Sequence, residues 1–238
     1  MSSLRNVGSE FVVTQDGLEL LDRQPELDGL LAEVVASEFA NPKGVSDYEP
    51  IGFGRHGRVS AIPEVPNLCV KMSSSAITEQ AHFLGDSKKG DPENLLVQTR
   101  FLDQIRRELV ENPEHEIDAP RQFFAARSND GVFVSIQERI VAPFTALSSL
   151  RTSWQHSEDY RQLVGLVRER VEIAFGGTAL RFAIDDLWHS DGMNVGNVLI
   201  DTTDSDDFIS LANARLYVID QPAHRFKTAR AVLRFAKS

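Results

Sequence analysis

The feature that most constrains the fold is the run of three glycines in Ile51–Val59, which reads IGFGRHGRV. Glycines at these offsets also open dinucleotide-binding βαβ units, in which a helix follows at once. Here Pro63 and Pro66 exclude a helix, and short apolar runs on either side of them predict a β-hairpin. Its second strand, Leu68–Met72, carries Lys71. Glycines let a backbone lie close over nucleotide phosphates, which a lysine on the next strand can reach. The alternative is an ordinary turn-rich hairpin with a surface lysine.

The composition narrows the class of protein. A chain of 238 residues with 42% hydrophobic and 25% charged residues is typical of an ordinary globular protein of one or two domains. The net charge of −10 argues against nucleic acid and anionic membranes as partners. The single cysteine, Cys69, excludes an internal disulfide, and on its apolar strand we expect it to be buried and unreactive. No signal-peptide pattern or membrane-length apolar run is present, so we expect a cytoplasmic location.

Residues 1–47 precede the glycine run and are predicted to form an accessory segment. Short strands are predicted at 10–14 and 18–21, around a Gln-Asp-Gly turn. Apolar residues then recur at helical spacing over Leu27–Phe39, which predicts an amphipathic helix that ends before a proline and a glycine. We expect this segment to pack on the hairpin region, with a partner-binding arm as the alternative.

The second informative stretch is His189–Ile200, a polar loop with His, Asp and Asn that runs into an apolar strand. After an acidic insertion comes a second strand, which ends in Asp220. Strands next to Asn197 and Asp220 could place an amide oxygen and a carboxylate on one Mg²⁺, which prefers hard oxygen ligands. Asp191 would then be the base or orienting group for an attacking hydroxyl.

In these elements and their order, the chain resembles the protein-kinase-like superfamily, including its aminoglycoside-phosphotransferase-like branch. The resemblance runs from Ile51 to Asp220 and implies a kinase-like phosphotransferase that uses ATP and Mg²⁺. It also implies an α+β, protein-kinase-like two-lobed fold, with a β-rich N-lobe and a shortened, mainly helical C-lobe. The residues that match are Gly52, Gly54, Gly57 and Val59 in the phosphate loop, Lys71 on the following strand, His189 and Asp191 in the catalytic loop, and Asn197 and Asp220 as metal ligands.

The resemblance also implies an acidic partner for Lys71 on the next helix. Asp91-Pro92-Glu93 is typical of a helix start, with a capping aspartate, a proline and an acid in the first turn. Glu93 is the acidic candidate, while Gln98 lies closer to the usual position but is neutral. A role for Glu93 in the helix dipole alone remains the alternative.

A further hairpin, predicted from residues 121–125 and 132–136, leads into Gln137–Ile140. In the kinase-like fold this segment would meet the adenine through backbone groups. Glu138 and Ile140 are therefore candidate nucleotide-binding residues by position.

The chain departs from the family pattern near the catalytic loop. Ser190 replaces an arginine, and the interval from Asp191 to Asn197 is one residue longer than usual, which leaves Asn194 as a competing metal ligand. Gln221-Pro222 replaces Phe-Gly, so we expect no switching activation loop.

We therefore predict an accessory segment at 1–47, an N-lobe at 48–140 and a reduced C-lobe at 141–238. The phosphate acceptor, a protein or small-molecule hydroxyl, is not identified by the sequence. The alternative function is that of a nucleotide-binding pseudokinase that acts as a scaffold or regulator.

Overall fold

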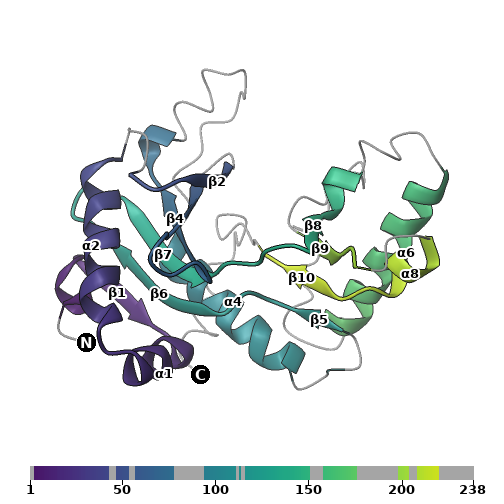
Figure 1. Ribbon diagram of the computed structural model, residues 1–238, viewed down its shortest axis with the longest axis horizontal. Helices are drawn as coiled ribbons and strands as arrows, with labels where there is room; N and C mark the ends of the chain where they lie inside the picture. Colours follow the sequence, from purple (N-terminus) through teal and green to yellow (C-terminus); the bar gives the residue numbers. More distant parts are fainter. Residues whose placement is uncertain are drawn as a thin grey trace, which may run out of the picture. The chain divides into compact units, whose positions relative to one another are not determined.

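The computed structural model describes most of the chain and shows a mixed α+β protein (Figure 1). Its described residues fall into two compact units, which are treated separately below. The first unit contains Met1–Asp103, Arg121–Arg139 and Pro222–Ser238, and the second contains Gln104–Pro120 and Ile140–Gln221. The described residues are 3–42, 47–53, 57–77, 94–110, 113, 116–150, 158–175, 198–203 and 208–219.

The first unit is built on a six-stranded antiparallel sheet with the strand order β1-β6-β7-β4-β3-β2. The two predicted hairpins are confirmed: one is β3 and β4, and the other is β6 and β7. In the second hairpin Gly131 takes the positive φ that the tight turn requires (φ 78°). The strands are β1 (Glu10–Val13), β2 (Pro50–Phe53), β3 (Arg58–Ala61), β4 (Leu68–Ser73), β6 (Gln122–Arg127) and β7 (Phe133–Glu138).

The two faces of this sheet follow from the alternation of side chains along each strand. On β4, Leu68, Val70 and Met72 belong to the main apolar core. Cys69 and Lys71 alternate with them and therefore point to the opposite face. We call these the rear face and the lysine face.

The rear face is covered by α1 (Gln15–Arg23) and α2 (Leu27–Ala40), as Figure 1 shows. The prediction of a strand at 18–21 is wrong, because these residues lie in α1. Thr14 starts that helix by accepting a hydrogen bond from the Gly17 amide at 3.0 Å. A Cβ on Gly17 would lie 2.1 Å from the Phe123 carbonyl oxygen, so only glycine lets the helix approach β6 this closely.

Helix α2 is present where the apolar spacing predicts it, but it is buried around most of its circumference. Its exposed stripe is narrow and has a single charged residue, Glu33. The other acids of the helix, Asp28 and Glu38, are 7% and 1% exposed. Burial of a carboxylate is costly unless hydrogen bonds or a counter-charge compensate it, and both acids have such partners. The helix is therefore part of the core of the first unit.

Helix α4 (Leu95–Val110) begins later than the predicted start at Asp91. The Asn94 side chain caps it by accepting a hydrogen bond from the Val97 amide at 3.3 Å. Leu95 and Leu96 form a small core with Ala125 and Phe133 of the sheet. This core lies on the lysine face, because Ala125 opposes Ser135, which in turn opposes Lys71.

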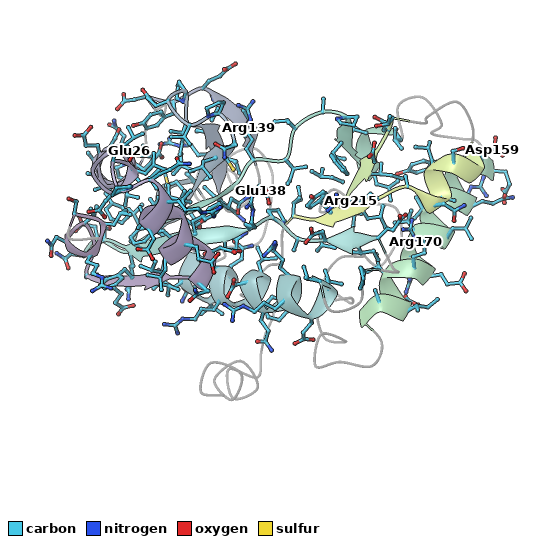
Figure 2. All side chains as sticks on the ribbon, turned by 60° about the horizontal axis from the view of Figure 1, so that its bottom comes forward. Glu26, Glu138, Arg139, Asp159, Arg170 and Arg215 are labelled. Atoms are coloured by element: carbon cyan, nitrogen blue, oxygen red, sulfur yellow. The ribbon has the colours of Figure 1, made fainter. Side chains whose placement is uncertain are left out.

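The second unit contains a four-stranded sheet with the order β5-β10-β9-β8, in which β5 and β10 are parallel and the other pairs antiparallel. Helix α6 packs on α8, a short helix that the sequence pattern did not predict. Arg170 of α6 donates hydrogen bonds of 2.8 Å to the carbonyls of Ala212 and Ala214, where α8 turns into β10 (Figure 2). The elements are β5 (Ile117–Asp118), β8 (Phe144–Ala146), η3 (Leu147–Leu150), α6 (Glu158–Phe175), β9 (Val198–Asp201), α8 (Phe208–Asn213) and β10 (Leu216–Val218).

Among the helices of the described residues, none combines the length and the apolar character needed to cross a bilayer.

Candidate functional site

Three of the predicted site residues lie in one row across the lysine face. Gly52 opposes Val59, Val59 opposes Lys71, and Lys71 opposes Ser135 of β7. Residues directly opposite each other in antiparallel strands share a face and are neighbours. The antiparallel pairing of β2, β3, β4 and β7 therefore brings Gly52, Val59 and Lys71 together, as the sequence predicts.

Lys71 is the charged group of this row. It is 6% exposed, and its ammonium donates a hydrogen bond of 3.0 Å to the Oε1 atom of Gln98 on α4. Gln98 is itself 3% exposed and lies one turn after the Asn94 cap. A buried ammonium needs hydrogen-bond partners, and the amide supplies one from the facing helix. Of the two candidates left open by the sequence, Gln98 bonds to Lys71, while Glu93 lies outside the described residues and stays a prediction.

Gly52 and Gly57, the two glycines of the run that the structure describes, differ in how much space surrounds them. A Cβ on Gly57 would lie 2.6 Å from the Met72 carbonyl oxygen and 3.8 Å from the Cε atom of Lys71. Any side chain at 57 would thus push β3 away from β4 beside the lysine stem. A Cβ on Gly52 would meet only the Val59 Cβ, at an ordinary 4.0 Å. Close packing therefore explains Gly57, and Gly54 lies outside the described residues.

The residues predicted to meet the adenine lie at and after the end of β7 (Figure 2). The Glu138 amide donates to the Arg121 carbonyl at 2.8 Å, and the Glu138 carbonyl accepts a 3.7 Å contact from the Cys69 thiol. The Glu138 side chain forms a 3.1 Å ion pair with Arg121. In the part of the chain that the structure describes, no hydrogen bond involves the backbone of Ile140. The Glu138 amide is thus engaged within the sheet, and the nucleotide-binding role of Ile140 stays a prediction.

Cys69 lies next to this row, on the lysine face. It is 2% exposed, which confirms the predicted burial, and burial raises the pKa of its thiol to about 12. The thiol is therefore protonated at neutral pH and contributes no nucleophile to the site.

In the second unit, the two strands predicted to flank the metal ligands are confirmed. Strands β9 and β10 are antiparallel neighbours, with Val198 opposite Val218. His189, Asp191, Asn194, Asn197 and Asp220 lie outside the described residues, so their predicted roles are not tested. Within the described ranges, no three His, Cys, Asp or Glu residues gather as a metal site would require.

The sequence analysis missed one buried ion pair near the glycine run. Nη2 of Arg58 lies 2.7 Å from Oε2 of Glu38, and the two side chains are 5% and 1% exposed. A signal for it exists in the sequence. Glu38 occupies a position at helical spacing from Leu31 and Val35, where only a paired charge is tolerated.

Comparison with known proteins gives limited information. No protein-family model matches the sequence, and no curated protein is similar to it. A solved structure of WaaP in complex with acyl carrier protein is similar over 89% of this chain and 70% of the WaaP chain, with 14% sequence identity and a TM-score of 0.42. This similarity is too low to carry an argument about fold or function.

Proposed function

We propose that this chain is an ATP- and Mg²⁺-dependent phosphotransferase of protein-kinase-like fold, which transfers the γ-phosphate to a hydroxyl group of a protein or small molecule. One observation carries the proposal. A buried lysine lies in one cross-strand row with Gly52 and Val59, beside Gly57, and its ammonium is held by Gln98 from a facing helix. An ordinary hairpin with a surface lysine would have left Lys71 in solvent.

The geometry around Lys71 suits the binding of nucleotide phosphates. A backbone without side chains at the glycines can approach the phosphates, and the ammonium can bind the α- and β-phosphate oxygens. The amide of Gln98 orients that ammonium without bringing a negative charge of its own. In this proposal Ile140 contributes its N–H and C=O to adenine binding, and Glu138 contributes the second lone pair of its carbonyl, since its amide is bonded to the Arg121 carbonyl.

The metal and catalytic roles belong to the second unit. When bound, Mg²⁺ would neutralise charge that develops on the phosphates. Asn197 immediately precedes β9 and Asp220 follows β10, and these strands are antiparallel neighbours. The start of one strand and the end of the other thus lie at the same end of the pair, which supports a shared site for an amide oxygen and a carboxylate. Asn194 is the competing ligand, and Asp191 would position or deprotonate the acceptor hydroxyl.

A thermal melt with and without ATP and Mg²⁺ tests nucleotide binding. A ligand that binds only the native state stabilises it by about 2.7 kcal/mol at a hundred times its Kd. We expect a higher melting temperature for the wild type and a much smaller shift for Lys71→Ala. If millimolar ATP leaves the wild-type melt unchanged, the proposal fails.

The alternative function is that of a nucleotide-binding pseudokinase, and the neutral partner of Lys71 favours it. The amide of Gln98 accepts a charge-assisted hydrogen bond from the ammonium but carries no opposite charge, so it lacks the Coulomb attraction that a carboxylate would add. Labelled ATP separates the two functions. Transfer of label to the protein itself, to water or to a lysate component supports the enzyme, whereas binding without any transfer supports the pseudokinase.

A further inference from the structure

The end of helix α2 and the residues just after it contact β3 and the segments next to β2 and β4. At this end Glu38 pairs with Arg58, the first residue of β3, at 2.7 Å. Arg58 also donates to the Asn41 carbonyl at 3.4 Å. Ser37 donates to the Asp47 carboxylate just before β2, at 2.6 Å, and Ser74, just after β4, donates to the Pro42 carbonyl at 3.1 Å.

Arg58 occupies a special place in the hairpin. It follows Gly57, whose close packing on Met72 admits no side chain, and it precedes Val59, which opposes Lys71. Arg58 itself opposes Met72 and therefore points to the rear face, toward α2. Its guanidinium is thus held by Glu38 on the rear face, while positions 57 and 59 lie on the lysine face.

We propose that Glu38 and Arg58 are positioning residues, which hold the glycine-rich hairpin in its nucleotide-binding arrangement before any ligand is present. This inference rests on the proposed function for its purpose, but the structural claim can be tested without nucleotide. A buried ion pair fixes the relative position of its two groups. Both charges have lost their solvation, and only close contact in good geometry compensates for this loss. Slippage or lifting of β3 would separate the charges, so the pair opposes both motions.

The opposite end of the same helix offers a matched control. Asp28 is also a buried acid of α2, but it accepts hydrogen bonds from the Ser3 and Leu4 amides and lies a full helix length from Arg58. Asp28→Asn and Glu38→Gln therefore make the same chemical change at two ends of one helix. Both changes should lower stability, and only Glu38→Gln should affect the hairpin.

The first arm of the experiment is hydrogen exchange on the full chain without nucleotide. We expect Glu38→Gln to speed exchange at the amides of β2 and β3 at least about tenfold more than at those of β6 and β7, because local opening leaves the rest of the sheet intact. Asp28→Asn should leave β2 and β3 as protected as in the wild type. Equal acceleration over all six strands, or none in β3, would overturn the proposal.

The second arm measures the Kd for ATP with Mg²⁺ at a temperature where every variant is fully folded, so that global stability does not enter. If the competent arrangement falls to about a fifth of the population, the apparent Kd rises about fivefold. We expect this for Glu38→Gln and a change of less than about twofold for Asp28→Asn. A wild-type Kd in folded Glu38→Gln contradicts a positioning role.

Two further outcomes are also decisive. If Glu38→Gln does not fold, Arg58→Lys replaces it, since this variant keeps the charge but its ammonium ends one bond closer to the backbone than Nη2, which donates to both Glu38 and Asn41. The same selective exchange in β2 and β3 is then expected. If the wild type does not bind ATP, the proposed function fails, while the exchange arm still decides whether the ion pair holds the hairpin.

Discussion

The two faces of the six-stranded sheet are made by alternate residues of the same strands, yet they have opposite characters. The rear face of β4 and β7 is apolar and packs under α2, and the neighbouring strand β3 adds Arg58 to this face, where it is paired with Glu38. The lysine face of the same strands carries Lys71, Ser135 and Gln137, all buried. The larger apolar core thus lies on one side of the sheet, and a row of buried polar side chains on the other.

The glycine-rich hairpin is therefore stabilised mainly by packing on its rear face. On the lysine face, apolar packing around Lys71 would exclude the nucleotide that we propose to bind there. The rear face, covered by α1 and α2, has no such constraint. Substitutions on the rear face should therefore change stability first, and those on the lysine face should change ligand binding first.

The largest expected effect is the truncation of a rear-face core residue. Phe124 is 1% exposed, and Phe124→Ala should lower the free energy of unfolding by about 3–5 kcal/mol through lost burial and the cavity left behind. Phe11, on the edge strand of the same sheet, is 41% exposed, so Phe11→Ala should cost less than about 1 kcal/mol. Urea unfolding measures both. Phe11 opposes Ala126 and so shares the rear face, and similar losses for the two variants would show that burial in the rear-face core does not determine the loss.

The next effect concerns the buried ion pair. Glu38→Leu leaves the Arg58 charge buried without its carboxylate and should cost about 3 kcal/mol of unfolding free energy. Adding Arg58→Met should recover most of this loss, since apolar pairs often replace buried ion pairs without cost. A double-mutant cycle in urea measures the recovery. Additive losses would mean that the two residues do not interact.

On the lysine face, we expect an effect on binding rather than on stability. Lys71→Met should remove most of the stabilisation by ATP, about 2.7 kcal/mol at a hundred times the Kd, and change the ligand-free unfolding free energy by only about 1 kcal/mol. Gln98→Ala should reduce the ATP effect as well, because Lys71 loses the amide that orients it.

Gln104→Ala is the matched control on the same helix, since Gln104 bonds to Glu108 and not to the lysine. It should leave the ATP-induced shift of the melting temperature intact. If Gln98→Ala and Gln104→Ala lower that shift equally, Gln98 has no special role.

A smaller, pH-dependent effect is expected at Asp28. Burial raises the pKa of its carboxyl, but hydrogen bonds from the Ser3 and Leu4 amides and the positive charge of the N-terminus together outweigh burial, so the pKa lies below the ordinary value of 3.8. The stabilisation is complete above the unfolded pKa and is lost as the pH falls through the folded pKa. Asp28→Asn should therefore lower the unfolding free energy by about 1 kcal/mol at pH 7, and the difference should shrink below about pH 4. Melts at several pH values test this, and a constant difference down to pH 2 would contradict it.

The smallest expected effect is the rate at which a thiol reagent labels Cys69. With a pKa of about 12, roughly one thiol in ten thousand is ionised at pH 8. A thiol reagent should therefore label the native protein very slowly and the urea-unfolded protein at the normal rate. Rapid labelling of folded protein would show that the lysine face opens near β4.

The strands of the two hairpins could be predicted from local patterns, whereas the short strands β5 and β8 were not predicted. The prolines and apolar runs around Lys71 indicated the first hairpin, and Ser128–Gly131 indicated the second. Helix α2 was predicted from apolar spacing, but residues 18–21 were not recognised as helical, because a short apolar run fits either a strand or a helix. The start of α4 was placed too early, since Asp91 and Asn94 are both acceptable caps and local chemistry does not choose between them.

The sequence by itself determined that Val59 and Lys71 belong to adjacent strands, because strand period and turn residues are local properties. Only the tertiary structure decided that Gln98 bonds to Lys71 and that Glu38 pairs with Arg58. Each of these contacts joins a helix to a strand that lies 20 or more residues away in the chain. Which of several polar side chains meets a buried charge depends on the rotation of a whole helix against the sheet, and that rotation is set by the packing of the entire core.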